Sequence, residues 1–145
     1  MKISAGTLIV LRNEKIFLCH PTNAKWNSTY SPPKGGVDVG EKVIDAAIRE
    51  TKEETSAIVT KDMISNRENP IEIEYKDKKG VAYKRVYLYR VDINSVKEIG
   101  LDSEVVPKNR LQAEEIDWAG FLDKKETEEK MFQRFEKIIE LVWKN

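Results

Sequence analysis

The sequence predicts one α/β domain of the α+β kind, a sandwich of helices around a mixed central sheet. Its hydrophobic pattern runs in the order two strands, a helix, several strands and a final helix, and such an order buries apolar faces by packing helices on a sheet. The 145 residues suit a single domain with a sizeable core. No repeat or linker divides residues 1–145, so we expect one domain across the whole chain.

The first elements form a predicted hairpin followed by a loop. Residues 3–11 and 15–20 are rich in β-branched and apolar side chains, which is typical of buried strands, and residues 12–14 are turn-like. Residues 21–34 are polar and aperiodic, so we expect a loop that ends at the pair Gly35-Gly36.

A helix over about 41–55 is predicted next. The periodicity assigns one stripe to the core: Ile44, Ile48, Thr51 and Thr55. Another stripe carries carboxylates, with Ala46 and Ala47 one turn before them. The two alanines have two explanations. Small side chains leave room for a bound phosphate, or alanine is there as the best helix former.

The second half alternates strands with connections. Residues 57–60 are expected to begin a strand, while 71–75 and 81–91 form a hairpin around the turn at 76–80. Residues 92–113 are a long connection of the kind that is often functional. A short strand is predicted at 115–121. A capping box over 123–126 then opens one amphipathic C-terminal helix, whose apolar face holds Met131, Phe132, Phe135, Ile138, Ile139 and Val142.

The composition excludes several classes of function. Lys+Arg and Asp+Glu balance at 25 each, so bulk affinity for nucleic acid or membranes is not expected. Cys19 is the single cysteine, which rules out an internal disulfide and favours a reducing, cytoplasmic location. No run approaches the ~20 apolar residues of a membrane span, and the segment after Met1 lacks a signal-peptide pattern. With His20 as the only histidine, a zinc site is not expected.

Three carboxylates carry the chemistry of the predicted helix. Glu50, Glu53 and Glu54 lie at i, i+3 and i+4 and therefore share one face. Like charges at this spacing destabilise a helix by ~0.2–0.5 kcal/mol per pair. A divalent cation turns that repulsion into coordination, and Mg²⁺ prefers carboxylate oxygen together with water and substrate phosphate.

This stretch resembles the sequence box of the Nudix family. Six positions are in register with it: Gly35, Glu41, Arg49, Glu50, Glu53 and Glu54. Thr51 stands where the box has an apolar residue, and Ser56 stands where it has a closing glycine, so both departures concern packing and helix termination. We expect Ser56 to be tolerated with a loss of stability. An acidic solvated helix face would explain neither the glycines nor Arg49.

The resemblance implies hydrolysis of a pyrophosphate bond in a nucleoside diphosphate linked to another group, with Mg²⁺ or Mn²⁺ as cofactor. It implies that Glu50, Glu53, Glu54 and the Gly35 carbonyl are metal ligands and that Glu53 and Glu54 are catalytic. Arg49 would orient the carboxylates, unless it forms an ordinary surface ion pair. The family often adds a base from the loop before the last strand, where Glu115 is our choice, with Glu114 or plain surface carboxylates as alternatives.

The entry Pro-Lys-Gly-Gly resembles the subgroup that acts on dinucleoside polyphosphates and diphosphoinositol polyphosphates, and RNA 5′-pyrophosphohydrolases have a related entry without the lysine. A lysine beside the metal site favours a long anionic phosphate chain, so Lys34 is a candidate substrate contact, although it is also an ordinary loop lysine in a lysine-rich chain. Candidates for stacking on a base are Trp26 and Tyr30, in the loop next to the box, and the strand residues Tyr83 and Tyr87, for which a place in the core is the alternative. Lys84, Arg85 and Arg90 would add positive potential, and no role is expected for His20.

Several alternatives stay open. The substrate is a dinucleoside polyphosphate such as diadenosine tetraphosphate, the 5′ end of an RNA, or ADP-ribose. A Nudix scaffold that binds a nucleotide without cleaving it is a different class, and the intact pair Glu53-Glu54 argues against it. A protein-interaction domain would need the apolar face of the C-terminal helix to be exposed. We expect a small-molecule nucleotide partner, no membrane, and either a monomer or a homodimer.

Overall fold

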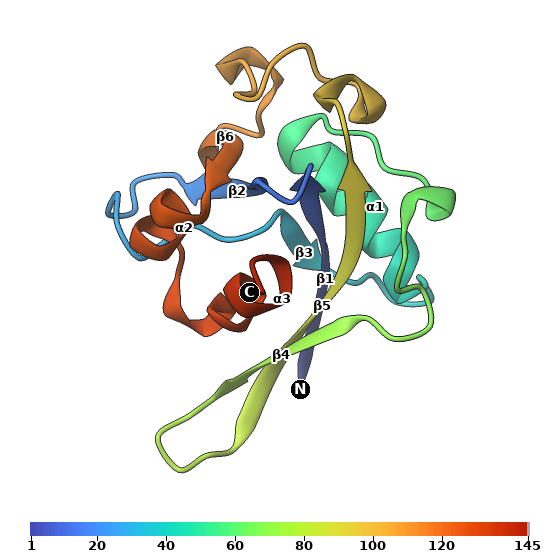
Figure 1. Ribbon diagram of the computed structural model, residues 1–145. Coiled ribbons are helices and arrows are strands. Elements are labelled where there is room, and N and C mark those ends of the chain that lie inside the picture. The colour runs from blue at the N-terminus through green and yellow to red at the C-terminus, as the bar shows by residue number, and fades with distance from the viewer. Residues whose placement is uncertain (145) are drawn as a thin grey trace.

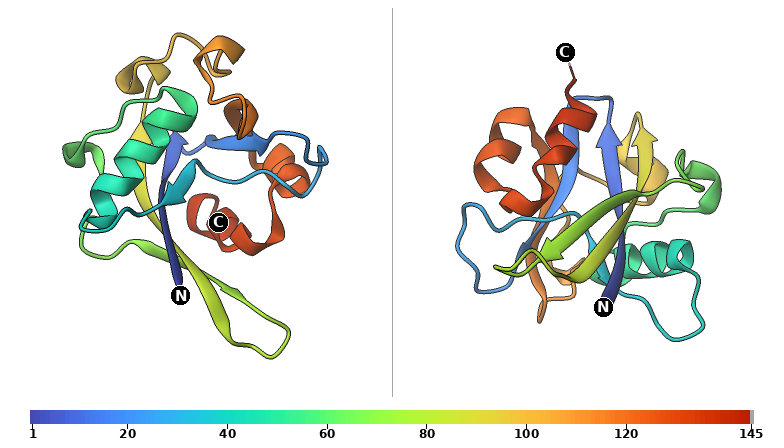
Figure 2. Two further views of the ribbon diagram at one scale, coloured as in Figure 1. Left: turned by 180° about the vertical axis from the view of Figure 1, so that it is seen from behind. Right: turned by 90° about the horizontal axis from the view of Figure 1, so that it is seen from below.

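The structure is a computed structural model that describes residues 1–144. A six-stranded mixed sheet lies between α1 on one face and α2 and α3 on the other (Figure 1). The view along the layers in Figure 2 shows α1 and the C-terminal helices on opposite sides of the sheet. The strands are β1 Lys2–Leu11, β2 Lys15–Pro21, β3 Lys34–Gly36, β4 Ile71–Lys76, β5 Ala82–Ile93 and β6 Ile116–Asp123. The α-helices are α1 Val43–Thr55, α2 Lys124–Lys130 and α3 Lys137–Val142.

Strand β1 is the centre of the sheet. The order is β4-β5-β1-β2-β6, with β3 paired to β1 outside this path. β5 pairs in parallel with the whole length of β1. β2 and β3 pair antiparallel with opposite ends of β1. The predicted α/β sandwich with a mixed sheet and both predicted hairpins are confirmed. The short strand β3 was not predicted, and it takes up the last residue of the expected 21–34 loop and the expected glycine turn at Gly35-Gly36.

Both faces of β1 are buried, which explains its nearly continuous apolar run. Ala5 and Ile9 pack on the side of α1, and Leu8 and Val10 pack on the side of α2 and α3. This alternation follows the two-residue period of a strand. The sheet therefore separates two cores, one of which fixes the position of α1.

Helix α1 rests on the sheet through small and hydroxyl-bearing side chains. Thr51 is fully buried, and its hydroxyl contacts the Thr7 hydroxyl at 2.8 Å and donates to the Ala47 carbonyl at 2.8 Å. The threonine that stands in place of an apolar residue therefore has hydrogen-bond partners inside the core. Ala46 and Ala47 are also fully buried. The idea that they leave room for a phosphate is therefore wrong, because they are packed within the core on this side of the sheet.

The predicted single C-terminal helix is wrong. The capping box at Asp123 is present, but α2 ends at Lys130 and Met131 is extended. The backbone amides of Ser28, Thr29 and Tyr30 donate to the carbonyls of Glu129 and Lys130. These two carbonyls therefore have hydrogen-bond partners without a further helical turn. A short 3₁₀ turn, Gln133–Phe135, then leads to α3. The apolar side chains still face the core, so the interaction-domain alternative loses its exposed face: Met131, Phe135, Ile138 and Val142 are buried.

The connections differ from expectation at one point. Residues 57–60 do not form a strand, although the backbone amide of Ile58 donates to the Ile99 carbonyl. A 3₁₀ turn, Lys61–Met63, follows them. The expected long connection after β5 is confirmed and contains two more 3₁₀ turns, Val96–Ile99 and Lys108–Arg110. Within residues 1–144, no helix is long and apolar enough to cross a membrane.

Ser56 ends α1 in the left-handed region, with φ of 68°. Its hydroxyl donates to the Arg110 carbonyl at 2.6 Å. Ser56→Ala loses this bond and keeps the backbone strain, whereas Ser56→Gly loses the bond but relieves the strain. We expect the glycine variant to be about 1 kcal/mol more stable than the alanine variant. Urea unfolding of both variants measures this, and equal midpoints would contradict it.

Candidate active site

A pocket of about 260 Å³ opens beside the C-terminal half of α1. Four of the predicted site residues line it: Lys34, Gly35, Glu54 and Glu115. Glu114 does not line it. A larger hollow of about 780 Å³ lies between α2 and α3, but it contains none of the carboxylates of α1. The smaller pocket is therefore the candidate site.

Gly35 brings β3 against α1. A Cβ atom at Gly35 would lie 2.0 Å from Oε2 of Glu50, so only a hydrogen atom fits between the strand and this carboxylate. Gly36 has no such neighbour within 4 Å. On the other side of β3, a Cβ atom at Gly6 would lie 2.1 Å from the Pro33 carbonyl oxygen. The two glycines Gly6 and Gly35 thus allow β3 to lie between β1 and the helix.

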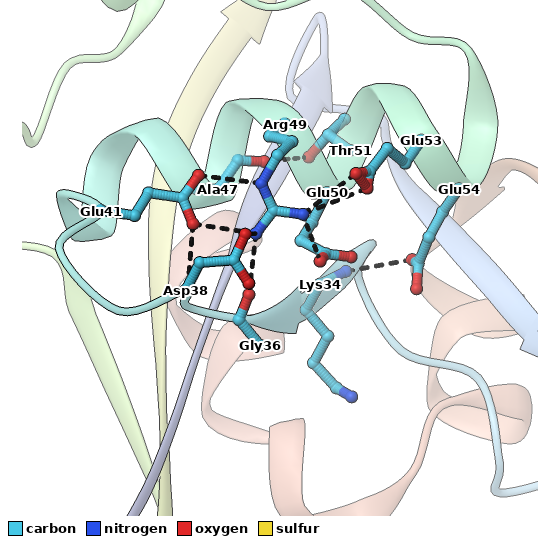
Figure 3. A network of polar contacts seen from close by, with 10 residues as sticks. All are labelled: Lys34, Gly36, Asp38, Glu41, Ala47, Arg49, Glu50, Thr51, Glu53 and Glu54. Carbon is cyan, nitrogen blue, oxygen red and sulfur yellow. Dashed lines mark hydrogen bonds and ion pairs between the residues drawn. The ribbon is translucent and has the colours of Figure 1, made fainter.

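Arg49 gathers acidic groups along one side of α1 (Figure 3). Its Nε and Nη2 donate to Glu41 at 2.8 and 2.9 Å, and Nη2 also donates to the Gly36 carbonyl at 2.9 Å. Nη1 donates to Glu50 at 2.8 Å and to Glu53 at 3.0 Å. One guanidinium therefore connects three carboxylates and strand β3, which is more than an isolated surface ion pair.

Glu41 is held ionised by this network. Hydrogen bonds from Arg49, followed by one from the Asp38 backbone amide, lower the pKa of Glu41 to about 2. The unfolded-state pKa is near 4.5, so the contribution of this group to stability is present above pH 4.5 and is lost as the pH falls towards 2.

Glu54 has the opposite environment. It is 7% exposed and accepts a hydrogen bond from the Lys34 backbone amide at 3.2 Å. Burial is the largest effect on Glu54, and together with the charges of Glu50 and Glu115 it raises the pKa of Glu54 to about 8 against the opposing effect of Lys34. Burial likewise raises the pKa of Glu50. A buried carboxylate in a pocket with other acids is typical of a functional site.

The donor set fits a hard divalent cation. Glu54 offers carboxylate oxygens at the pocket, whereas Glu50 and Glu53 lie on the same face of α1 without lining it. Gly35 presents its backbone against Glu50. Among residues 1–144, no three acidic, histidine or cysteine side chains are already arranged as a metal site. Arg49 accounts for this, because its guanidinium holds the carboxylates of Glu50 and Glu53. Binding would require these two side chains to reorient.

The four aromatic residues that were predicted to stack on a base lie outside the pocket. Tyr30 is 3% exposed and packs in the core on the side of α2 and α3, so its ring is not accessible to a base. Tyr87 is partly buried against the core on the side of α1 and does not line the pocket. Tyr83 and Trp26 are exposed, at 49% and 56%, but neither lines the pocket. Of these four rings, the structure brings none into the site itself.

His20 has a structural role that the sequence did not indicate. It is fully buried, and its Nδ1 lies 2.5 Å from Oδ1 of Asp117. Its Nε2 lies 2.8 Å from the Lys25 carbonyl, and the Trp26 ring stacks on the imidazole at 3.9 Å. His20 therefore fixes the loop after β2 to strand β6, next to the segment that carries Glu115.

Of the three predicted basic residues of β5, one reaches the pocket. Lys84 lines it, whereas Arg85 pairs with Glu74 and Glu72, and Arg90 pairs with Asp92. Lys2 also lines the pocket and was missed. Its partner in the sheet is 82 positions away, at Lys84, so no local pattern could indicate it.

Arg49→Lys is expected to lower kcat about 100-fold. Lysine keeps the charge but loses the planar fork that contacts Glu41, Glu50 and Glu53 together, and carboxylates left unoriented lose their catalytic geometry. Steady-state kinetics measures the effect, with Arg110→Lys as a matched control outside the network. Wild-type kcat in Arg49→Lys would show that charge alone suffices.

The fold is an α/β/α sandwich, and Glu54 and Glu115 line a pocket beside its helix α1. Two similar solved structures are the Ap4A hydrolase of Caenorhabditis elegans, in a binary complex, and a MutT NUDIX hydrolase of Burkholderia pseudomallei. The first has a TM-score of 0.65 and 24% identity and covers 98% of this chain and 93% of its own. The second has a TM-score of 0.70 and 17% identity and covers 98% of both chains. These likenesses establish the fold.

A family model described as NUDIX domain matches residues 2–139, and the chain belongs to the Nudix family. It is also 37% identical over 75 residues to the asymmetrical bis(5′-nucleosyl)-tetraphosphatase of Caenorhabditis elegans. That match spans 52% of this chain and 52% of the relative, or about half the length of each. The sequence resemblance to the Nudix family is thereby confirmed.

Proposed function

We propose that the protein is a Mg²⁺-dependent pyrophosphohydrolase whose substrate is a dinucleoside polyphosphate such as diadenosine tetraphosphate. The observation that carries the proposal is that one pocket is lined both by the carboxylates Glu54 and Glu115 and by the lysines Lys34 and Lys84. Carboxylates supply metal-binding oxygen, and lysines supply charge for a phosphate chain. The partial match to a bis(5′-nucleosyl)-tetraphosphatase supports the same substrate class.

In this proposal Glu50, Glu53, Glu54 and the Gly35 carbonyl hold the metal, for which Mn²⁺ is an alternative. A bound cation would neutralise phosphate charge and make a water molecule more acidic. Arg49 would keep Glu50 and Glu53 on the face of α1 that borders the metal, and both carboxylates would turn from the guanidinium towards the cation on binding. Glu115 accepts a proton of the attacking water as the water oxygen bonds to phosphorus. The bond from that phosphorus to the bridging oxygen breaks, and the bridging oxygen leaves on the other nucleotide product.

Glu115→Gln tests the base. We expect kcat to fall at least 100-fold while KM stays within about twofold, because a general base acts in the transition state. Glu114→Gln is the matched control, since this neighbour is exposed and does not line the pocket. A wild-type rate in Glu115→Gln would remove this residue from the mechanism.

The substrate is tested with a panel measured at one Mg²⁺ concentration: diadenosine tetraphosphate, ADP-ribose, a nucleoside triphosphate and 5′-triphosphorylated RNA. We expect the highest kcat/KM for diadenosine tetraphosphate. Lys34→Ala should reduce kcat/KM most for the substrates with more phosphates. A preference for ADP-ribose or RNA would replace the proposed substrate and leave the family assignment unchanged.

A further inference from the structure

Three lysines gather at the end of the pocket that lies away from α1. Lys2, Lys34 and Lys84 all line the same cavity as Glu54 and Glu115. Lys34 joins the two ends, since its backbone amide donates to Glu54 while its side chain points away from the helix (Figure 3). The pocket is therefore acidic near α1 and basic at its other end.

Strand pairing places the lysines together. Lys2 is the first residue of β1 and lies opposite Lys84 in the parallel strand β5. Lys34 belongs to β3, on the other edge of β1, where it lies opposite Gly6. The missing side chain at Gly6 lets Lys34 approach, because a Cβ atom there would lie 2.7 Å from Cβ of Lys34. Like charges directly opposite each other in a sheet are destabilising.

In the described part of the chain, this lysine cluster has no close ion-pair partner. Within residues 1–144, none of the three ammonium groups lies within 4 Å of a carboxylate. The neighbouring Arg85, by contrast, is paired with Glu72 and Glu74. Partial burial, followed by the charges of Lys34 and Lys2, lowers the pKa of Lys84 to about 8. An anion with several charges would relieve this repulsion.

We propose that Lys2 completes a three-lysine subsite for a linear phosphate chain, and that this subsite selects substrates by the number of phosphates beyond the cleaved bond. The reference to a cleaved bond rests on the function proposed above, whereas the binding of a phosphate chain by the three lysines does not. A bridging tetraphosphate carries four ionised phosphates, which suit three ammonium groups and a metal centre. A bridging diphosphate carries two and leaves part of the cluster uncompensated. Inorganic and nucleotide-bound chains share this chemistry.

The first test measures binding and does not need catalysis. Inorganic tetrapolyphosphate and pyrophosphate are titrated by calorimetry into wild-type protein and into Lys2→Ala, with EDTA present. We expect Lys2→Ala to weaken tetrapolyphosphate about tenfold and pyrophosphate less than threefold. Lys2→Arg should restore the affinity, and Lys78→Ala, an exposed lysine at the tip of the β4–β5 hairpin, is the matched control. Equal losses for both ligands, or no loss, would overturn the proposal.

The second test separates nucleotide-bound from inorganic chains. KM and kcat are measured for diadenosine tetraphosphate and ADP-ribose with the same variants. We expect Lys2→Ala to raise KM mainly for diadenosine tetraphosphate, with a smaller effect on kcat. If neither nucleotide is hydrolysed but chain-length-dependent binding is present, the proposed function fails and the subsite stands. Uniform KM changes for both nucleotides would refute the selection by chain length.

Discussion

Glu54→Gln is expected to abolish hydrolysis and yet to make the metal-free protein more stable above pH 8. Loss of a carboxylate from the metal-binding set should lower kcat by about 1000-fold, which corresponds to roughly 4 kcal/mol of transition-state stabilisation. The gain in stability follows from burial, since Glu54 is 7% exposed and its pKa is raised to about 8. Glutamine has a similar shape and keeps an acceptor for the Lys34 amide without a charge.

The sign of the pH effect follows from the two pKa values. The unfolded-state pKa of Glu54 is near 4.5 and the folded-state value is about 8. Between these values the unfolded chain releases a proton that the folded protein retains, so this group lowers stability progressively as the pH rises. The difference in Tm between Glu54→Gln and wild type in EDTA should therefore grow from pH 5 to pH 8 and then level off. A constant difference across this range contradicts the burial argument.

Gly35→Ala is expected to remove most of the activity, whereas Gly36→Ala is expected to remove little. A methyl group at Gly35 would lie 2.0 Å from the Glu50 carboxylate, so either this carboxylate or β3 must move. A displacement of this size at a catalytic group lowers kcat by about 100-fold or more. Gly36 is the next residue of the same strand, and a methyl group there meets nothing within 4 Å.

Steady-state kinetics measures kcat of both glycine variants, and circular dichroism shows whether each variant is folded. A folded Gly35→Ala protein with reduced kcat supports the close approach of β3 to Glu50. Equal activity of the two variants would mean that Glu50 does not need its position against β3.

The sequence predicted those parts of the site that local spacing determines. Glu50, Glu53 and Glu54 share a helix face because of the helical period, and Arg49 precedes them in the same motif. The structure adds Arg49's contacts with Glu41 and with the Gly36 carbonyl, which depend on how the glycine segment folds back onto the helix.

The parts that the sequence did not predict depend on contacts between distant segments. The C-terminal helix is interrupted because loop amides near Tyr30 bond its last carbonyls, and the same packing buries the Tyr30 ring. Lys2 reaches the pocket only through its register with Lys84 in a parallel strand pair. Periodicity describes the face of one element, and it does not report which element lies beside it.

The most direct test of the account is product analysis of diadenosine tetraphosphate incubated with wild-type protein, with and without Mg²⁺, beside the Glu53→Gln/Glu54→Gln double variant. We expect nucleotide products only with wild-type protein and Mg²⁺, and none with EDTA or with the double variant. Intact substrate in every reaction, together with substrate binding by wild type, would contradict a hydrolytic site and favour a nucleotide-binding module.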